Sequence, residues 1–265
     1  MTGLPAYVQL VRAPNPGPMT LDGTNTWLVG DPTLGPPLVV DPGPAIETHL
    51  AAVLAAAGGR LAGIVLTHRH LDHSESAADL ARRAGCGVRA LDPQLRIGAD
   101  DLEDGRPIEV GGVTLTPYAT PGHTSDSCCL LLRGPAGAWL LTGDTVLGRG
   151  TSVITHPDGN LGAYLTSLDR LQRLVAEEAV VALLPGHGPL VDEPAVWLTS
   201  YQRHRHERLE QVRTALEALA AEGVGADVAQ LADRVYAGLD PAVRPAVEQS
   251  IQAQLVYLSS FSADS

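Results

Sequence analysis

The sequence predicts an α/β protein in which helices cover two strand-rich halves, followed by a small helical module. Three observations lead to this prediction. Short β-type runs alternate with helical stretches up to about residue 192, these runs gather in two halves, and a long helical period begins near residue 194. A layered sandwich accounts for the alternation better than a single parallel sheet. We therefore expect two domains, residues 1–193 and residues 194–265.

The elements of the first domain follow from short apolar runs that end at turn residues and from stretches with helical spacing. Strands are predicted at residues 6–11, 24–30, 37–43, 63–68, 112–122, 127–134, 138–144 and 180–186. Helices are predicted at residues 46–58, 74–84 and 160–175. The first of these helices ends at Gly58, because glycine readily adopts the backbone conformation that closes a helix.

The second domain has a purely helical pattern. From Trp197 to Leu219, apolar residues recur three and four positions apart, which predicts one long amphipathic helix that starts near Pro194. Two more helices are predicted at residues 226–238 and 241–259. We expect these helices to form a small module beside the main domain.

The composition excludes some classes of partner. The formal net charge is −12, and all 18 basic residues are arginine, so non-specific binding to nucleic acids or membranes is disfavoured. No apolar run is long enough to span a bilayer, and the N-terminus lacks the pattern of a secretory signal. Cys86, Cys128 and Cys129 suggest no disulfide framework. We expect a soluble cytoplasmic protein.

Three of the nine histidines lie within six positions, in the segment THRHLDHSE at residues 67–75. Neighbouring imidazoles repel one another when protonated, so such a cluster indicates a cation between them. His68 and His70 project to the same side of extended backbone, where both can bind one ion. Asp72 and His73 follow where the chain turns into a helix, and they point to a second position nearby.

Three further candidate ligands follow predicted strands, each after an apolar run and a tight turn that contains glycine. They are His123 in TPGHTSDS, Asp144 in WLLTGDT and His187 in ALLPGHG. Glycine beside a ligand allows the backbone to approach closely and to adopt unusual φ angles. The complete set suffices for two ions that share one carboxylate. We expect one ion at His68, His70 and His123, the other at Asp72, His73 and His187, and Asp144 between them.

The ordered set THRHLDH, PGHT, GDT and PGHG, within residues 24–188, resembles the metallo-β-lactamase superfamily. The resemblance implies a four-layer αββα sandwich with metals in a groove at its edge, and a metal-dependent hydrolase. Two Zn²⁺ ions would share a hydroxide that attacks a carbonyl or phosphoryl centre, with Asp72 as the catalytic residue that orients it. Imidazoles and carboxylates suit Zn²⁺, with Mn²⁺ or Fe²⁺ as alternatives. A mononuclear iron dioxygenase branch shares much of the motif.

Within the superfamily, three stretches resemble the β-lactamase-like protein 2 family: NPGPMTLDGTNTWLVG, GDTVLGRGTSVI and HRHERLEQV. Its members resemble single-strand-specific, metal-dependent endoribonucleases with a C-terminal winged-helix-like module. The resemblance implies single-stranded RNA as the substrate. Two alternatives stay open. One is hydrolysis of a small-molecule ester or thioester, of the glyoxalase II type. The other is a winged-helix-type binding module whose metals are structural.

A few polar residues outside the ligand set are candidates for the groove. Asn25 and Thr26 either bind substrate there or pair at a strand end, and the sequence favours neither. His204 and Arg205 lie on a charge-rich predicted helix, for which a solvated face is favoured over contact with a phosphate in the groove. Surface positions are expected for the two histidines that have no partner in the pattern, His49 and His156.

Overall fold

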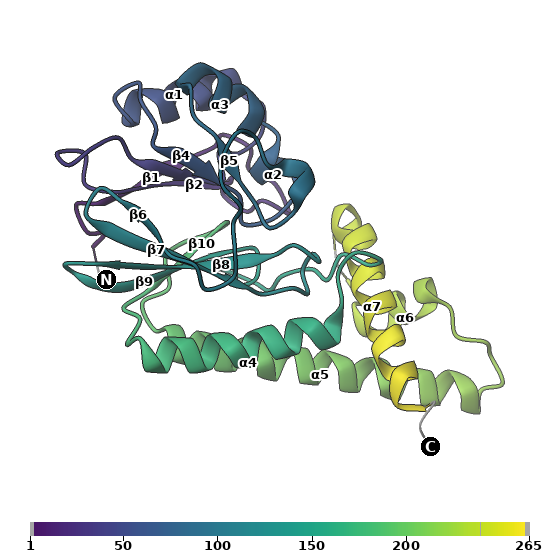
Figure 1. Ribbon diagram of the computed structural model, residues 1–265. Helices are drawn as coiled ribbons and strands as arrows, with labels where there is room; N and C mark the ends of the chain where they lie inside the picture. The colour runs from purple at the N-terminus through teal and green to yellow at the C-terminus, as the bar shows by residue number, and fades with distance from the viewer. Residues whose placement is uncertain (1–2, 239, 263–265) are drawn as a thin grey trace.

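Two mixed sheets pack face to face with helices on both outer sides in the computed structural model of the protein (Figure 1). The structure describes residues 3–238 and 240–262. Helices α1 (Glu47–Ala56) and α3 (Ala77–Ala84) cover the first sheet, and α4 (Leu161–Glu177) and α5 (Pro194–Ala221) cover the second. The predicted four-layer αββα sandwich is confirmed.

The first sheet contains five strands in sequence order: β1 (Val8–Arg12), β2 (Asn25–Val29), β3 (Leu38–Val40), β4 (Gly63–Val65) and β5 (Val88–Arg89). The pairs from β1 to β3 are antiparallel, and those from β3 to β5 are parallel. Parallel neighbours direct their carboxyl ends to the same edge of a sheet. The loops that follow β3 and β4 therefore start side by side.

The second sheet has the order β10 (Leu183–Pro185), β9 (Gly137–Gly143), β8 (Cys128–Gly134), β7 (Val113–Ala119) and β6 (Ile108–Val110). Strands β7 and β9 are both antiparallel to β8, and β10 is parallel to β9. Strands β7, β9 and β10 therefore run in the same direction. Their carboxyl ends meet at one edge, and the next residues of each strand are drawn together there.

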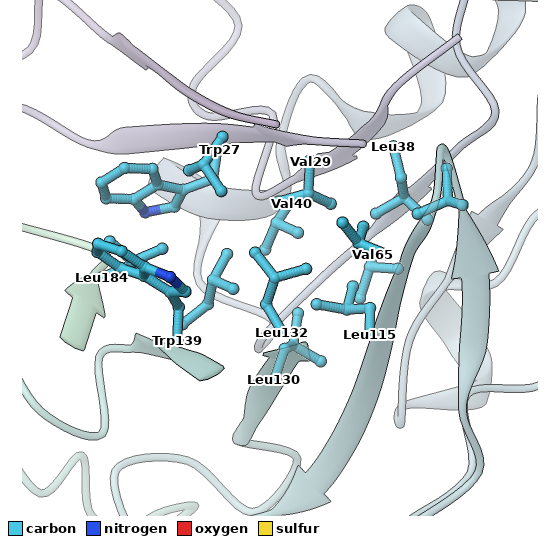
Figure 2. Close-up of a cluster of buried hydrophobic side chains, with 14 of the residues drawn as sticks. Trp27, Val29, Leu38, Val40, Val65, Leu115, Leu130, Leu132, Trp139 and Leu184 are labelled. Carbon is cyan, nitrogen blue, oxygen red and sulfur yellow. The ribbon is translucent and has the colours of Figure 1, made fainter. Parts of the chain in front are cut away.

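The core between the sheets arises from alternation along the strands. In β8, Leu130 and Leu132 belong to the cluster between the sheets, whereas Cys129 and Leu131 belong to the cluster beneath α4 and α5. This alternation is the two-residue period of a strand that is buried on both faces. Figure 2 shows Leu130, Leu132 and Trp139 of the second sheet facing the aliphatic side chains and the tryptophan of the first.

Local signals explain where several helices begin and end. The Asn160 side chain accepts a hydrogen bond from the backbone N–H of Ala163 and caps α4. Helix α3 ends at Gly85, whose φ of 65° is left-handed. The predicted helix at residues 74–84 is divided, because α2 (Leu71–Ser74) precedes α3 as a separate turn. Strands β5 and β6 were not predicted, because Val88–Arg89 and Ile108–Val110 each contain a charged residue and form no continuous apolar run.

After residue 193 the described part of the chain consists of helices joined by short turns and loops. Helix α5 is followed by α6 (Val228–Val235), a 3₁₀ turn (Pro241–Val243) and α7 (Arg244–Ser262). The first half of α5 packs on the main domain through Leu198 and Tyr201, and its second half packs with α6 and α7 through Val212 and Leu219. Within residues 3–238 and 240–262, no helix combines the length and apolar character needed to cross a membrane. The division at residue 193 stays a prediction.

Candidate metal centre

Loops at the carboxyl ends of β4, β7, β9 and β10 bring all seven predicted ligands together. Six of the seven form two groups in which the ligand atoms lie within 4.8 Å of one another, and a third such group, Asp41, His68 and His73, overlaps both. The first group is His68, His70 and His123, and the second is Asp72, His73 and His187. These are the two sets expected from the sequence. That they bind metal stays a prediction.

In the first group, three imidazole nitrogens converge on one point. His70 Nδ1 lies 3.1 Å from His68 Nε2 and 3.0 Å from His123 Nε2. The other nitrogen of His123 donates a hydrogen bond to the Val153 carbonyl at 2.6 Å, which leaves the lone pair of Nε2 facing its neighbours. Three ring nitrogens that converge in this way leave room for a cation to accept their lone pairs.

In the second group, hydrogen bonds hold both rings in place from outside. His73 Nδ1 donates to Asp41 Oδ2 at 2.9 Å, and His187 Nδ1 lies 3.3 Å from the Gly23 carbonyl. The two Nε2 atoms therefore face each other at 3.1 Å. Asp72, on α2, completes the group, since its Oδ2 lies 3.1 Å from His187 Nε2 and 3.6 Å from His73 Nε2.

Asp144 lies between the two groups. Its Oδ2 is 3.4 Å from His187 Nε2 and 3.8 Å from His123 Nε2, and its Oδ1 is 3.4 Å from His73 Nε2. The sharp turn that delivers this side chain needs Gly143, whose φ of 46° is left-handed. Asp144 Oδ1 is buried and has no hydrogen-bond partner within the described part of the chain. A buried, unpaired carboxylate oxygen needs a positive partner.

These features fit a pair of metal ions. Zinc binds imidazole nitrogen at about 2.0–2.1 Å, so that tetrahedral ligands lie about 3.3 Å apart. The ligand atoms measured within the two groups lie between 3.0 and 3.6 Å apart. The buried Asp144 Oδ1, which has no hydrogen-bond partner in the described part of the chain, also favours a bound cation. The donor set is nitrogen and carboxylate oxygen, which suits zinc and also Mn²⁺ or Fe²⁺.

Burial and neighbouring charges shift the histidine pKa values in opposite directions in the two groups. Burial lowers the pKa of His123 to about 4 and also lowers the pKa of His68 and His70, so these rings are neutral, as metal ligands must be. Burial opposes protonation of His187 too, but Asp144 and Asp72 outweigh it and raise its pKa to about 9. In the second group, a divalent cation would therefore take the place of the proton that the His187 ring holds when no metal is bound.

Two residues outside the predicted set hold the metal-binding loops. Asp41, at the end of β3, accepts hydrogen bonds from Thr67 N–H at 2.8 Å and from Thr67 Oγ1 at 2.7 Å besides its contact with His73. Arg69, between His68 and His70, pairs with carboxylates of three other loops, Asp92, Asp126 and Asp158. The segment LVVDPG carried a signal for Asp41, because an acid follows an apolar strand there as it does at Asp144.

We expect the substitution Asp41→Asn to weaken metal binding by roughly 10–100-fold, the range found for residues that orient metal ligands. The amide cannot accept every hydrogen bond that the carboxylate accepts, so His73 loses the partner that fixes its Nε2 lone pair toward the site. Titration with a competing chelator measures the affinity. Asp100→Asn, whose side chain is 81% exposed, is the matched control. Equal zinc affinity of Asp41→Asn and wild type would contradict the orienting role.

The other polar candidates from the sequence lie outside the two ligand groups. Asn25 and Thr26 are structural, since Asn25 Nδ2 donates to the carbonyls of Pro185 and Gly188 and Thr26 Oγ1 donates to that of Asp41. The expected surface position of His49 is wrong, because its ring is buried 2.9 Å from Thr26 Oγ1. His156 is half-buried.

The solvated face expected for His204 and Arg205 is wrong as well. Arg205 is buried and His204 is half-buried, and both line a pocket whose wall includes His123 and Asp144. The helix pattern missed this arrangement because α7 and the loop after β9 cover that face of α5, and neither neighbour is visible in a local sequence window.

An αββα sandwich with two neighbouring groups of histidine and aspartate side chains that could hold metal ions is typical of metal-dependent hydrolases. The model of the family described as "Metallo-beta-lactamase superfamily" matches residues 19–187, which is more than half of the chain. The protein belongs to this superfamily.

Several relatives share a substantial part of the sequence. The chain is 34% identical over 229 residues to Lactamase-like protein aptB of Emericella nidulans, covering 85% of this chain and 70% of the relative. It is 32% identical over 252 residues to the Beta-lactamase-like protein 2 homolog of Caenorhabditis elegans, covering 91% and 80%. The resemblance to β-lactamase-like protein 2 is thereby confirmed.

A third relative is the Atrochrysone carboxyl ACP thioesterase AgnL7 of Paecilomyces divaricatus, 33% identical over 219 residues. The alignment covers 78% of this chain but only 63% of that protein. Among solved structures, a metallo-beta-lactamase family protein from Thermus thermophilus has a TM-score of 0.79 at 20% identity, covering 97% of this chain and 94% of that chain. A beta-lactamase domain protein from Burkholderia ambifaria has a TM-score of 0.77 at 21% identity, covering 97% and 88%. These likenesses establish the fold alone.

Proposed function

We propose that the protein is a dinuclear zinc hydrolase that cleaves an acyl ester or thioester. The two ligand groups around Asp144 support two ions rather than one. The nitrogen and oxygen donors favour zinc, with Mn²⁺ or Fe²⁺ as alternatives. Two such ions, if bound, would lower the pKa of a coordinated water and polarise the reacting oxygen of the substrate.

The proposal of an acyl ester or thioester as the substrate rests on a pocket of about 290 Å³ beside the predicted ligands. His123 and Asp144 form one part of its wall, and apolar side chains form much of the rest: Met19, Leu21, Leu147, Val153, Val243 and Val247. The volume equals that of about ten water molecules, which suits a short acyl chain. An apolar pocket next to the ligands would hold such a chain with its carbonyl carbon at the metal centre.

Asp72 is the proposed catalytic residue. Its side chain is 30% exposed, and its Oδ2 lies 3.1 Å from His187 Nε2, at the border between the ligands and the solvent. Burial would raise the pKa of Asp72, but His73 and His187 lower it below its usual value, so the carboxylate is ionised. In this position it orients the attacking water and accepts its proton.

Single-stranded RNA is the second candidate substrate, and the sequence motifs alone had favoured it. The observation in its support is that Arg149, His204 and Arg208 line the same pocket, since such groups bind phosphate oxygens. The net charge of −12 and the small apolar pocket favour the acyl substrate over RNA. The cytoplasm is the proposed location, in keeping with the free cysteines Cys86, Cys128 and Cys129.

Side-by-side assays of the zinc-loaded protein test the proposal. We expect hydrolysis of 4-nitrophenyl butyrate and S-lactoylglutathione, with cleavage of an end-labelled single-stranded RNA at background. Dialysis against a chelator should abolish turnover, and added zinc should restore it. Cleavage of RNA without acyl hydrolysis would contradict the ester proposal in favour of the second candidate. No turnover of any of these substrates with two zinc ions bound would count against both.

The variant His70→Ala separates catalytic from structural metals. If the metals are catalytic, the variant keeps the circular dichroism spectrum of the wild type and loses activity. If the ions were structural parts of a binding module, the same variant would unfold.

A further inference from the structure

Arg205 is a buried cation that has no counter-ion among the residues that the structure describes. It lies on α5, and its side chain is among the buried residues, with 6% of the residue exposed. One guanidinium nitrogen donates to the Ser152 carbonyl, and the guanidinium carbon lies 4.9 Å from the centre of the Tyr164 ring. Its Nε–H is buried and has no acceptor among the residues that the structure describes. Within the same residues, no carboxylate forms an ion pair with it.

Such an arrangement is unusual for an arginine. The guanidinium keeps its charge at every accessible pH, and arginine is almost never fully buried unless it is paired. A carbonyl oxygen and an aromatic face offset part of the lost hydration, but they do not neutralise the charge. The Nε–H that remains free is the donor that a carboxylate or phosphate oxygen accepts.

The surroundings extend this feature into a site. Arg205 lines the pocket of about 290 Å³ that reaches His123 and Asp144. Arg149, Arg208 and His204 line it as well, and among the described residues Asp144 is the only acidic one in the lining. Arg149 pairs with Asp22, and Arg208 donates to Gln211 and the Val235 carbonyl, all outside the pocket lining. His204 lies 3.3 Å from Thr151 Oγ1, and the Arg208 guanidinium lies over the Tyr236 ring, so these two partners are part of the lining. The pocket therefore combines an apolar wall with an excess of positive charge.

We propose that this pocket binds an oxyanion on a short apolar chain, with the Nε–H of Arg205 as its central donor. The shared chemistry is a carboxylate or a phosphate group. If the proposed function is right, the natural ligand is the substrate: an ester or thioester whose acyl part ends in an anionic group, held by Arg205 while the carbonyl reaches the metal centre. Arg205 then determines substrate specificity and takes no part in bond cleavage.

Isothermal titration calorimetry on the metal-loaded protein tests the site without any turnover. Hexanoate probes a carboxylate, hexyl phosphate probes a phosphate, and 1-hexanol is the uncharged comparison. We expect at least one anion to bind more tightly than 1-hexanol. We also expect Arg205→Gln to lower the affinity for that anion by about tenfold or more. The tighter of the two anions identifies the source of the charge. The matched control is Arg203→Gln on the same helix, since the Arg203 side chain is 70% exposed and we expect its affinity to equal that of wild type.

Several outcomes would overturn the proposal. The first is equal affinity of wild type and Arg205→Gln for both anions, which coordination to the metals alone would give. The second is that neither anion binds more tightly than 1-hexanol. Arg205→Lys keeps the charge without the planar fork, and we expect its affinity to lie between those of wild type and Arg205→Gln. If only the lysine variant folds, affinity equal to wild type would speak against Arg205 as the donor. Because binding is measured directly, an error about the reaction leaves this test intact.

Discussion

The variant Asp144→Ala should lose hydrolytic activity by at least about a thousandfold and bind fewer than two metal ions per chain. Asp144 lies within 3.8 Å of residues in both ligand groups, so its removal takes a ligand from each predicted ion. The two ions would also lose the negative charge between them, which lowers their mutual repulsion in the wild type. Steady-state kinetics and elemental analysis of the purified variant measure the two effects.

The matched control is Asp100→Ala, which removes a carboxylate that is 81% exposed and pairs with Arg89. It should keep both the activity and the metal content of the wild type. If Asp144→Ala kept two ions per chain and full activity, Asp144 would not be a shared ligand, and the assignment of the two sets would have to change.

The variant Gly186→Ala should abolish activity and metal binding although every ligand is still present. A Cβ at Gly186 would lie 2.6 Å from Asp144 Oδ1 and 2.7 Å from His73 Cε1, closer than a methyl group tolerates. Both of these atoms belong to ligand side chains, so accommodation of the methyl group moves one or both ligands out of position. A displacement of about 1 Å at a catalytic site costs on the order of a hundredfold in rate.

The control Gly225→Ala adds the same methyl group where nothing lies within 4 Å. We expect it to retain zinc content and turnover. Circular dichroism and thermal melting tell displaced ligands from a misfolded chain, because a local shift leaves the spectrum unchanged. A Gly186→Ala protein with normal metal content and rate would show that the described spacing around Asp144 is not the functional one.

The predicted ligands could be assigned to two groups from the sequence because each lies in a loop or short helix that follows a strand. His68, His123, Asp144 and His187 are placed by the ends of β4, β7, β9 and β10, and the direction of those strands fixes their common edge. At these positions the local sequence pattern was therefore enough to predict which side chains lie close together. Asp41 follows the same rule and went unrecognised because a lone aspartate before Pro-Gly is also a common turn.

Arg205 illustrates the opposite case. In sequence it is one of several charged residues on a long amphipathic helix, and its neighbours Arg203 and Glu207 form an exposed pair. The packing of α7 and the loop after β9 against α5 is what buries Arg205 and faces it toward a pocket. His49 is similar, because the fold of β2 against α1 brings Thr26 to its ring.

The sequence by itself predicted a layered α/β sandwich and the two sets of candidate ligands, because strand periodicity and polar residues near strand ends are local features. Its motifs also carried the resemblance to the superfamily, which implied the αββα layers. Only the tertiary structure decided the orientation of His73 by Asp41, the orphaned oxygen of Asp144 and the burial of Arg205. Each of these depends on desolvation by segments far away along the chain. Desolvation is what turns an ordinary polar side chain into one that needs a particular partner.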